Sequence, residues 1–266
     1  MAAAVTAEIA RYDLYNRRRS TIWYAVGMAL YMLVVVALYP SFEHSTELNK
    51  LTQGNSPLAA LFGATGTLTS PAGWMNVNAY ANFLPLIMLL LTIGYGAGAI
   101  AGQNEDGTLG LLVVLPLARR RILAGKVATM IVQALILDLT VAACMYVGRA
   151  FQVTLNPWHV ATATFAVLLL GVDLGLIALA LGAATGSRGN AIGIASALAG
   201  LCYLISSLAP VVDWIKPLRF ASLFYWAVAN QQLTNGTPPE SFAILIGVAI
   251  AAAISANTAF RRLDIR

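Results

Sequence analysis

The sequence predicts an all-α, polytopic membrane protein with six transmembrane helices. Of its 266 residues, 59% are hydrophobic and 10% are charged, whereas soluble domains carry about 45–50% apolar and about 25% charged residues. Six apolar segments are long enough to cross a bilayer, and none contains Lys or Arg. Continuous runs of this kind favour helices over the alternating strands of a membrane barrel. The composition excludes disordered and collagen-like chains and ordinary soluble enzymes.

The expected spans are residues 22–39, 83–101, 127–147, 160–184, 191–212 and 242–260. Residues 22–266 are therefore expected to form one six-span domain. The first apolar run is too long for a signal peptide and lacks an Ala-x-Ala site before Ser41, which favours a retained span.

Residues 1–21 are expected to form an amphipathic helix on the membrane surface. Val5, Ile9 and Tyr12 recur at helical spacing on one face, and the arginines at positions 17–19 would face water or lipid headgroups. The alternative is a solvated basic arm that only sets the topology.

The distribution of basic residues predicts that both termini are cytoplasmic, because Lys and Arg are enriched on the cytoplasmic side of membrane proteins. With six spans, twelve basic residues lie on the side of the termini and four on the other side. The twelve are Arg11, Arg17, Arg18, Arg19, Arg119, Arg120, Arg121, Lys126, Arg188, Arg261, Arg262 and Arg266, and the four are Lys50, Arg149, Lys216 and Arg219.

Two segments on the outer side are long. In residues 41–81 we expect a short interfacial helix over residues 57–68, which are apolar but too few to span. Residues 213–240 carry an aromatic belt expected at headgroup depth, and they either dip back into the membrane or only anchor its surface. The belt consists of Trp214, Phe220, Phe224, Tyr225 and Trp226.

Asp138 and Asp173 lie near the middle of the expected third and fourth spans. Carboxylates inside a membrane are costly and usually face a protein interior or a cavity. One interpretation is a proton site or a contact for a cationic amphiphile. The preferred interpretation is a protonated acid that bonds a neighbouring helix, with Gly171 and Gly175 permitting its approach.

The sequence contains no phosphate-binding loop, no H-E-x-x-H zinc motif and no G-x-S-x-G nucleophile elbow. The glycine-rich run at residues 94–102 resembles a dinucleotide fingerprint. It lies in an apolar span with no strand before it, so we expect close helix packing instead. The same packing is expected at Gly171 and Gly175, Gly182 and Gly186, and Gly189 and Gly193.

The segment 103–126, between the second and third spans, is unusual for a plain linker. Two acids and Gly107-Thr108 predict a helix that starts near Thr108. An apolar run over residues 109–115 is too short to span, Pro116 ends it, and a basic cluster follows. A short apolar helix of this kind must pack under its own bundle or against another protein.

In this position the segment resembles the type-2 ABC transporter permease family. The residues that carry the resemblance are Glu105, Gly107, Thr108, Leu109, Leu111, Leu112, Pro116, Arg119, Gly125 and Lys126. The stretch at residues 69–74 and the long last outer segment extend the resemblance to essentially the whole chain.

The resemblance implies a coupling helix that docks on a separate cytosolic ATPase. Glu105 would be a polar anchor near the cytoplasmic end of the second span, and Leu109, Leu111 and Leu112 would form the docking face, with Gly107, Thr108 and Pro116 shaping the segment. The arginines at 119–121 are expected to fix topology and contact headgroups.

The implied function is the permease subunit of an exporter for an amphiphilic compound such as a drug, an antibiotic or a lipid. The chain itself would be no enzyme and hold no cofactor, since ATP and Mg²⁺ would bind the partner ATPase. The implied partners are two ATPase copies, a second or homologous permease and the lipid bilayer, without nucleic acid. The implied location is the bacterial plasma (inner) membrane. The alternative is an ion-coupled secondary transporter that uses Asp138 and Asp173.

Overall fold

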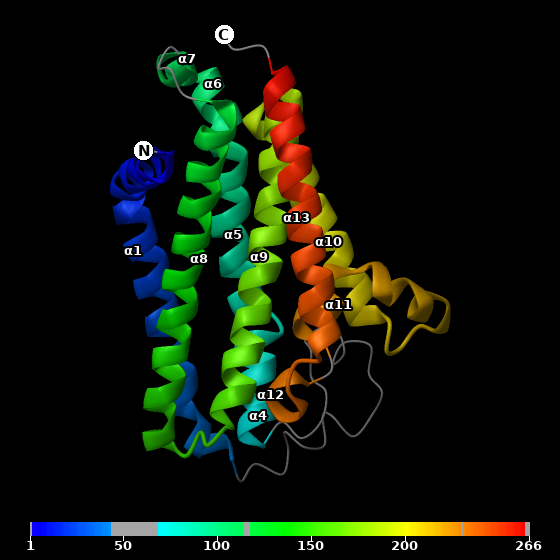
Figure 1. The fold of residues 1–266 in the computed structure, drawn as a ribbon. Coiled ribbons are helices and arrows are strands. Elements are labelled where there is room, and N and C mark those ends of the chain that lie inside the picture. Colours follow the sequence, from blue (N-terminus) through cyan, green and yellow to red (C-terminus); the bar gives the residue numbers. More distant parts are fainter. Residues whose placement is uncertain (1, 44–68, 114–117, 230, 264–266) are drawn as a thin grey trace.

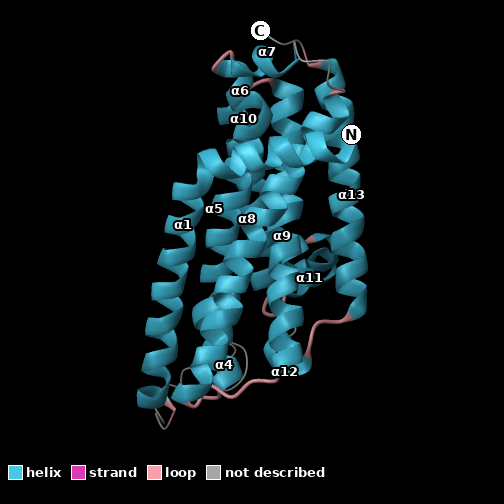
Figure 2. Ribbon diagram, turned by 60° about the vertical axis from the view of Figure 1, so that its left-hand side comes forward, coloured by secondary structure: helices cyan, strands magenta, loops and turns pink. Residues whose placement is uncertain are grey.

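The computed structural model describes residues 2–43, 69–113, 118–229 and 231–263. This part of the chain forms a bundle of long helices, and it contains no strand (Figures 1 and 2). Six helices in it are long and apolar enough to cross a membrane, which confirms the expected number of spans. They are α1 (Ala2–Phe42), the helical stretch Pro71–Glu105, α8 (Arg119–Gly148), α9 (Pro157–Thr185), α10 (Arg188–Leu208) and α13 (Pro239–Arg262).

The first helix joins two elements that were expected to be separate. α1 continues without a break from the N-terminal segment into the first span. Its first part lies across one end of the bundle and then bends into the span (Figures 1 and 2). Near this bend, Thr21 Oγ1 donates to Arg17 O at 3.1 Å and accepts from Gln133 Nε2 at 2.8 Å. A hydroxyl that bonds the preceding turn often bends a helix.

The second span starts earlier than expected. It consists of α4 (Pro71–Met75), the π-helix η1 (Asn76–Tyr80), α5 (Phe83–Ala97), the π-helix η2 (Gly98–Gly102) and α6 (Gln103–Glu105). Hydropathy placed its start at residue 83 because three asparagines precede the apolar run. The side-chain amides of two of them donate hydrogen bonds to the backbone of the same helical stretch. Asn78 Nδ2 donates to Trp74 O at 2.9 Å, and Asn82 Nδ2 donates to Val77 O at 3.1 Å.

The fifth span is shorter than expected, because α10 ends at Leu208 rather than at residue 212. The 3-10 helix η4 (Asp213–Ala221) then projects from the side of the bundle, and α11 (Leu223–Val228) and α12 (Gln232–Asn235) lead back to α13 (Figure 1). Within the expected aromatic belt, Tyr225 and Trp226 pack against Phe220. In η4, the hydrogen bond from Lys216 lowers the pKa of the Asp213 carboxyl below its ordinary value. The interfacial helix expected at residues 57–68 lies outside the described residues.

Helix α9 is the centre of the bundle and packs against α5, α8, α10 and α13. Close approach through glycine is confirmed on its α5 side. A Cβ atom at Gly96 would overlap the backbone carbonyl of Gly175, and one at Gly171 would meet the Met88 side chain. The same expectation is wrong for Gly189 and Gly193, where an added Cβ has no atom within 4 Å among the described residues.

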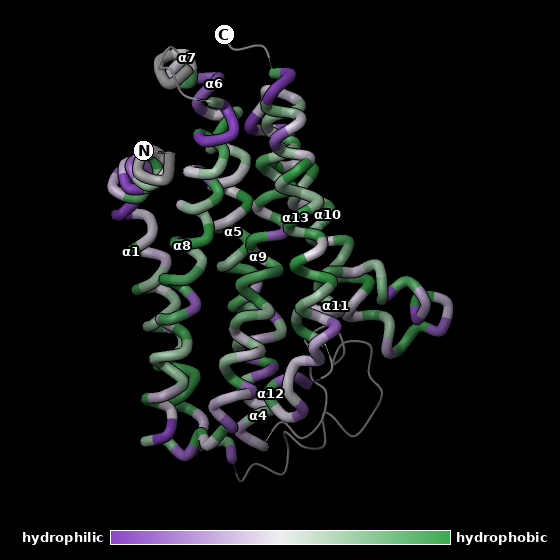
Figure 3. The backbone as a smooth tube through the Cα atoms, viewed as in Figure 1, coloured by the Kyte–Doolittle hydropathy of each residue, from purple (hydrophilic) through white to green (hydrophobic). Residues whose placement is uncertain are grey.

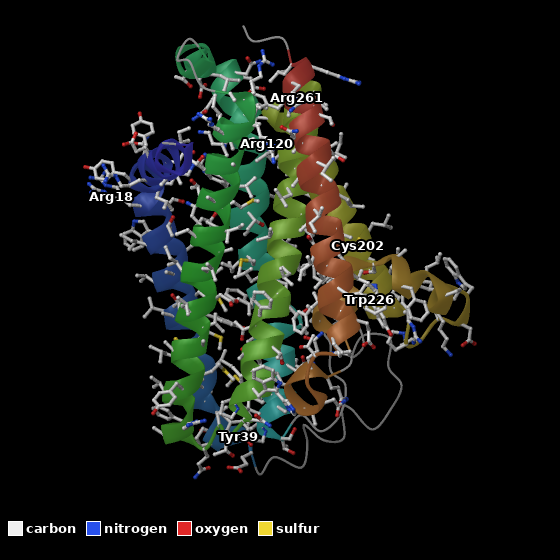
Figure 4. The ribbon with its side chains drawn as sticks, viewed as in Figure 1. Arg18, Tyr39, Arg120, Cys202, Trp226 and Arg261 are labelled. Atoms are coloured by element: carbon white, nitrogen blue, oxygen red, sulfur yellow. The ribbon has the colours of Figure 1, made fainter. Side chains whose placement is uncertain are left out.

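The two ends of the bundle differ in charge. Apolar residues follow the long helices, and polar residues gather at their ends (Figure 3). Arg18, Arg120 and Arg261 lie toward the same end, and Tyr39 lies at the opposite end (Figure 4). We call the end that carries these three arginines the basic end. The start of α1, the end of α13 and the described parts of the segment 103–126 all lie there (Figure 1).

Candidate functional site

The candidate site is the coupling segment, which we define as residues 103–126 at the basic end. α6 ends at Glu105, a turn follows, and α7 (Thr108–Val113) comes next. Gly107 has φ +70°, a left-handed conformation that glycine adopts at low cost. Thr108 Oγ1 donates to Gln103 O at 3.3 Å across this turn. The sequence therefore predicted the start of α7 correctly.

The expected docking leucines are only partly described. Leu109 is 0% exposed, so its side chain packs within this chain and does not belong to an open face. The side chains of Leu111 and Leu112, and the whole of Pro116, lie outside the described residues.

Glu105 contacts the fifth span. Its Oε1 atom accepts a hydrogen bond from the backbone N–H of Arg188 at 2.9 Å, at the first turn of α10. Helix N-termini leave N–H groups without helical partners, and a carboxylate there is favoured by both hydrogen bonding and the helix dipole. Glu105 thus joins the end of the second span to the start of the fifth.

Arg119 contacts the sixth span, a contact that the sequence did not predict. Its Nη1 atom donates to three carbonyl oxygens at the end of α13, those of Phe260 at 2.7 Å, Arg261 at 3.2 Å and Leu263 at 3.1 Å. Its guanidinium also lies 5.6 Å from the centroid of the Phe260 ring. Arg119 therefore caps the C-terminus of α13, where carbonyls lack helical partners.

Lys126 contacts the N-terminal part of α1. Its Nζ atom lies 3.0 Å from Oδ1 and 2.8 Å from Oδ2 of Asp13. The hydroxyl of Tyr95, on α5, donates to Asp13 Oδ2 at 2.9 Å. Lys126 is 1% exposed and Asp13 is 7% exposed, so the ion pair is buried.

Sequence reasoning missed Asp13. The available signal was its position four residues after Ile9, which places an acid on the face of the helix that carries apolar residues. An acid in such a position needs a partner when the face is buried.

The two intramembrane acids do not behave as hydrogen-bonded links between helices. Asp173 is 0% exposed, and neither of its carboxylate oxygens has a hydrogen-bond partner in the described part of the chain. Asp138 Oδ1 is also buried without a partner there. The interpretation of Asp173 as an acid that bonds a neighbouring helix is therefore wrong for this conformation.

Comparison with known proteins assigns the chain to a protein family. The model of a family described as ABC-2 family transporter protein matches residues 7–265. The probable ABC transporter permease protein NosY of Stutzerimonas stutzeri is 37% identical over 125 residues, which are 47% of this chain and 38% of that protein. The protein of the same description from Pseudomonas aeruginosa is 44% identical over 69 residues, which are 26% of this chain and 24% of that protein. Because the family match covers nearly the whole sequence, the chain belongs to the ABC-2 family of transporter proteins.

Proposed function

We propose that this chain is the permease subunit of an ATP-driven exporter that moves an amphiphilic compound such as a drug, an antibiotic or a lipid. A separate ATPase would bind ATP and Mg²⁺, and two copies would serve a pair of permease subunits. The observation that carries the proposal is that Glu105 and Arg119, which precede and follow the short helix α7 in the sequence, bind the ends of α10 and α13.

The proposed orientation places the basic end in the cytoplasm of a bacterial cell, with the chain in the plasma membrane. Basic residues concentrate at this end of the bundle (Figure 4), and the positive-inside rule places such an end on the cytoplasmic side. A cytosolic ATPase would then meet α7 directly.

The proposed mechanism transmits ATPase movement through the coupling segment. α7 docks on the ATPase, and a displacement of α7 reaches α5 and α8 through the chain itself. The Glu105 carboxylate carries the displacement to the start of α10, and the Arg119 guanidinium carries it to the end of α13. Both contacts are charge-assisted hydrogen bonds, which are shorter and stronger than neutral ones. Four spans would therefore move when one short helix is displaced.

The test uses the complete complex in proteoliposomes. Glu105→Gln removes the charge from the first contact at unchanged side-chain length, and Arg119→Gln replaces the guanidinium of the second contact with a shorter neutral amide. We expect both variants to assemble with the ATPase and to hydrolyse ATP, while ATP-dependent export of a fluorescent amphiphile falls. Arg120→Gln is the matched control, because Arg120 is exposed and adjacent. Full ATP-driven export in both test variants would refute the coupling role.

The second candidate function is ion-coupled secondary transport. It is favoured by one observation, the complete burial of Asp173, whose two carboxylate oxygens have no hydrogen-bond partner among the described residues. An ionised carboxylate without a partner is costly in the membrane, so an acid here favours the uptake of a proton or a cation. Under this alternative, Asp173→Asn abolishes transport and an ion gradient drives transport without ATP. Under the favoured proposal, an ion gradient alone drives no transport.

A further inference from the structure

The contact between Asp13, Lys126 and Tyr95 differs from the other contacts of the coupling segment. Glu105 and Arg119 bind the ends of α10 and α13, whereas this cluster is buried and joins α1, α5 and α8. We call these three residues the latch. None of the three is needed to explain how α7 would meet an ATPase.

The backbones around the latch are also in close contact. A Cβ atom at Gly125 would lie 2.8 Å from Ile9 Cγ2 and 3.2 Å from Thr6 O. One turn further along α8, Thr129 Oγ1 lies 3.3 Å from Ala10 O. The glycine before Lys126 thus lets the N-terminal part of α1 lie directly on α8. Both residues of the Gly125-Lys126 pair are therefore explained by contacts with α1.

A second cation, Arg17 on α1, contacts the Tyr95 side chain of the latch. The guanidinium of Arg17 lies 4.9 Å from the centroid of the Tyr95 ring. Arg17 Nη2 would lie 3.3 Å from a Cβ atom at Gly98. Tyr95 is thereby held between Asp13 and Arg17, both on α1, so α1 and α5 meet through more than one contact.

Stability alone does not account for an ion pair in this place. Replacing a buried ion pair by apolar side chains of similar volume is often neutral or stabilising, whereas removing one partner is strongly destabilising. Apolar packing tolerates sliding and rotation, but Asp13 accepts hydrogen bonds from Lys126 and Tyr95 in fixed directions. The latch therefore fixes one register of α1 against α5 and α8.

The position of the latch suits it to transmit movement. α8 begins at Arg119, inside the coupling segment, and Lys126, the last residue of that segment, lies seven residues further, about 10 Å along the helix axis. On the other side, α1 continues from Asp13 to Phe42 without a break. A displacement of the first turns of α8 would reach the first span through the latch.

We propose that Asp13, Lys126 and Tyr95 are positioning residues that make the first span follow the third when the coupling segment moves. The proposal rests on the ATP-driven function proposed above. It adds the first span to the set of helices that the coupling segment displaces.

The test measures distances between spin labels in the permease–ATPase complex in lipid nanodiscs, after replacement of the two native cysteines. One pair of labels, at Tyr12 and Ala124, lies on exposed positions beside the latch. The other pair, at Leu38 and Ile246, reports the distance between the first and sixth spans toward the opposite end of the bundle. Both distances are measured without nucleotide and after trapping with ATP and vanadate.

The decisive variant is the double substitution Asp13→Leu with Lys126→Met, which removes the ion pair and keeps the volume. In the unaltered chain we expect the Tyr12–Ala124 distance to stay narrow and constant while the Leu38–Ile246 distance shifts on trapping. In the double variant we expect the first distance to broaden and the shift of the second to be lost. Asp213→Leu with Lys216→Met is the control, because it removes an exposed ion pair far from the latch.

Two results would overturn the proposal. One is a double variant whose two distances behave as in the unaltered chain. The other is a Tyr12–Ala124 distance that changes on trapping in the unaltered chain. If Leu38–Ile246 never responds to nucleotide in the unaltered complex, the ATP-driven function itself fails. In that case the Tyr12–Ala124 distance alone tests whether the latch fixes α1 against α8. Broadening of this distance in the double variant supports that role, and an unchanged distance refutes it.

Discussion

Removing the carboxylate of Asp13 should destabilise the protein far more than removing an exposed acid. In Asp13→Ala the ammonium group of Lys126 keeps its place, 1% exposed, without the two carboxylate oxygens at 2.8 and 3.0 Å. Tyr95 also loses the acceptor of its hydroxyl. Breaking a buried ion pair on one side costs about 3–5 kcal/mol, which is a change of at least about 100-fold in the folding equilibrium.

The assay is reversible denaturant unfolding in mixed micelles, followed by tryptophan fluorescence. Asp213→Ala is the control. Because the ion pair of Asp213 with Lys216 is exposed, we expect no measurable loss of unfolding free energy in this variant. The double variant Asp13→Leu with Lys126→Met should recover most of the stability lost in Asp13→Ala, because no buried charge is left unpaired. If Asp13→Ala unfolds at the same denaturant concentration as the unaltered protein, the ion pair is not buried as the structure places it.

The remaining predictions concern the packing, the cap of α13 and the topology. Gly96→Ala should prevent normal assembly, because its Cβ would overlap a backbone carbonyl of α9, and size-exclusion profiles would show the loss of the normal species. Gly193→Ala should instead stabilise α10 by about 0.5–1 kcal/mol, which thermal unfolding would measure. Arg119→Leu should speed hydrogen exchange in the last turn of α13, since three carbonyls lose their donor, and unchanged exchange would contradict the cap. A cysteine at Asn235 should react with an impermeant thiol reagent outside intact cells and one at Ser187 should not; labelling at Ser187 would reverse the proposed topology.

The spans were predictable because hydropathy is a local property of the sequence. A run of about 20 apolar residues without Lys or Arg has few alternatives to a membrane helix. The predictions were wrong where the local composition of the sequence does not reflect the structure. Asn78 and Asn82 lowered the hydropathy of residues that continue the second span, yet their amides bond the helix backbone itself. Leu109 was expected on the docking face, and only the tertiary structure shows it to be buried.

The sequence by itself determined the six spans, the asymmetry of charge and the place of the coupling segment, since each depends on residues that are close in the chain. The tertiary structure decided what that segment contacts. Lys126 meets Asp13 across 113 positions and Arg119 meets Phe260 across 141. Such pairs depend on the rotation and register of whole helices against one another, which a local pattern does not encode. For that reason the sequence shows Asp13 only as an acid on an apolar helix face, and the structure shows it as the residue that joins α1 to α5 and α8.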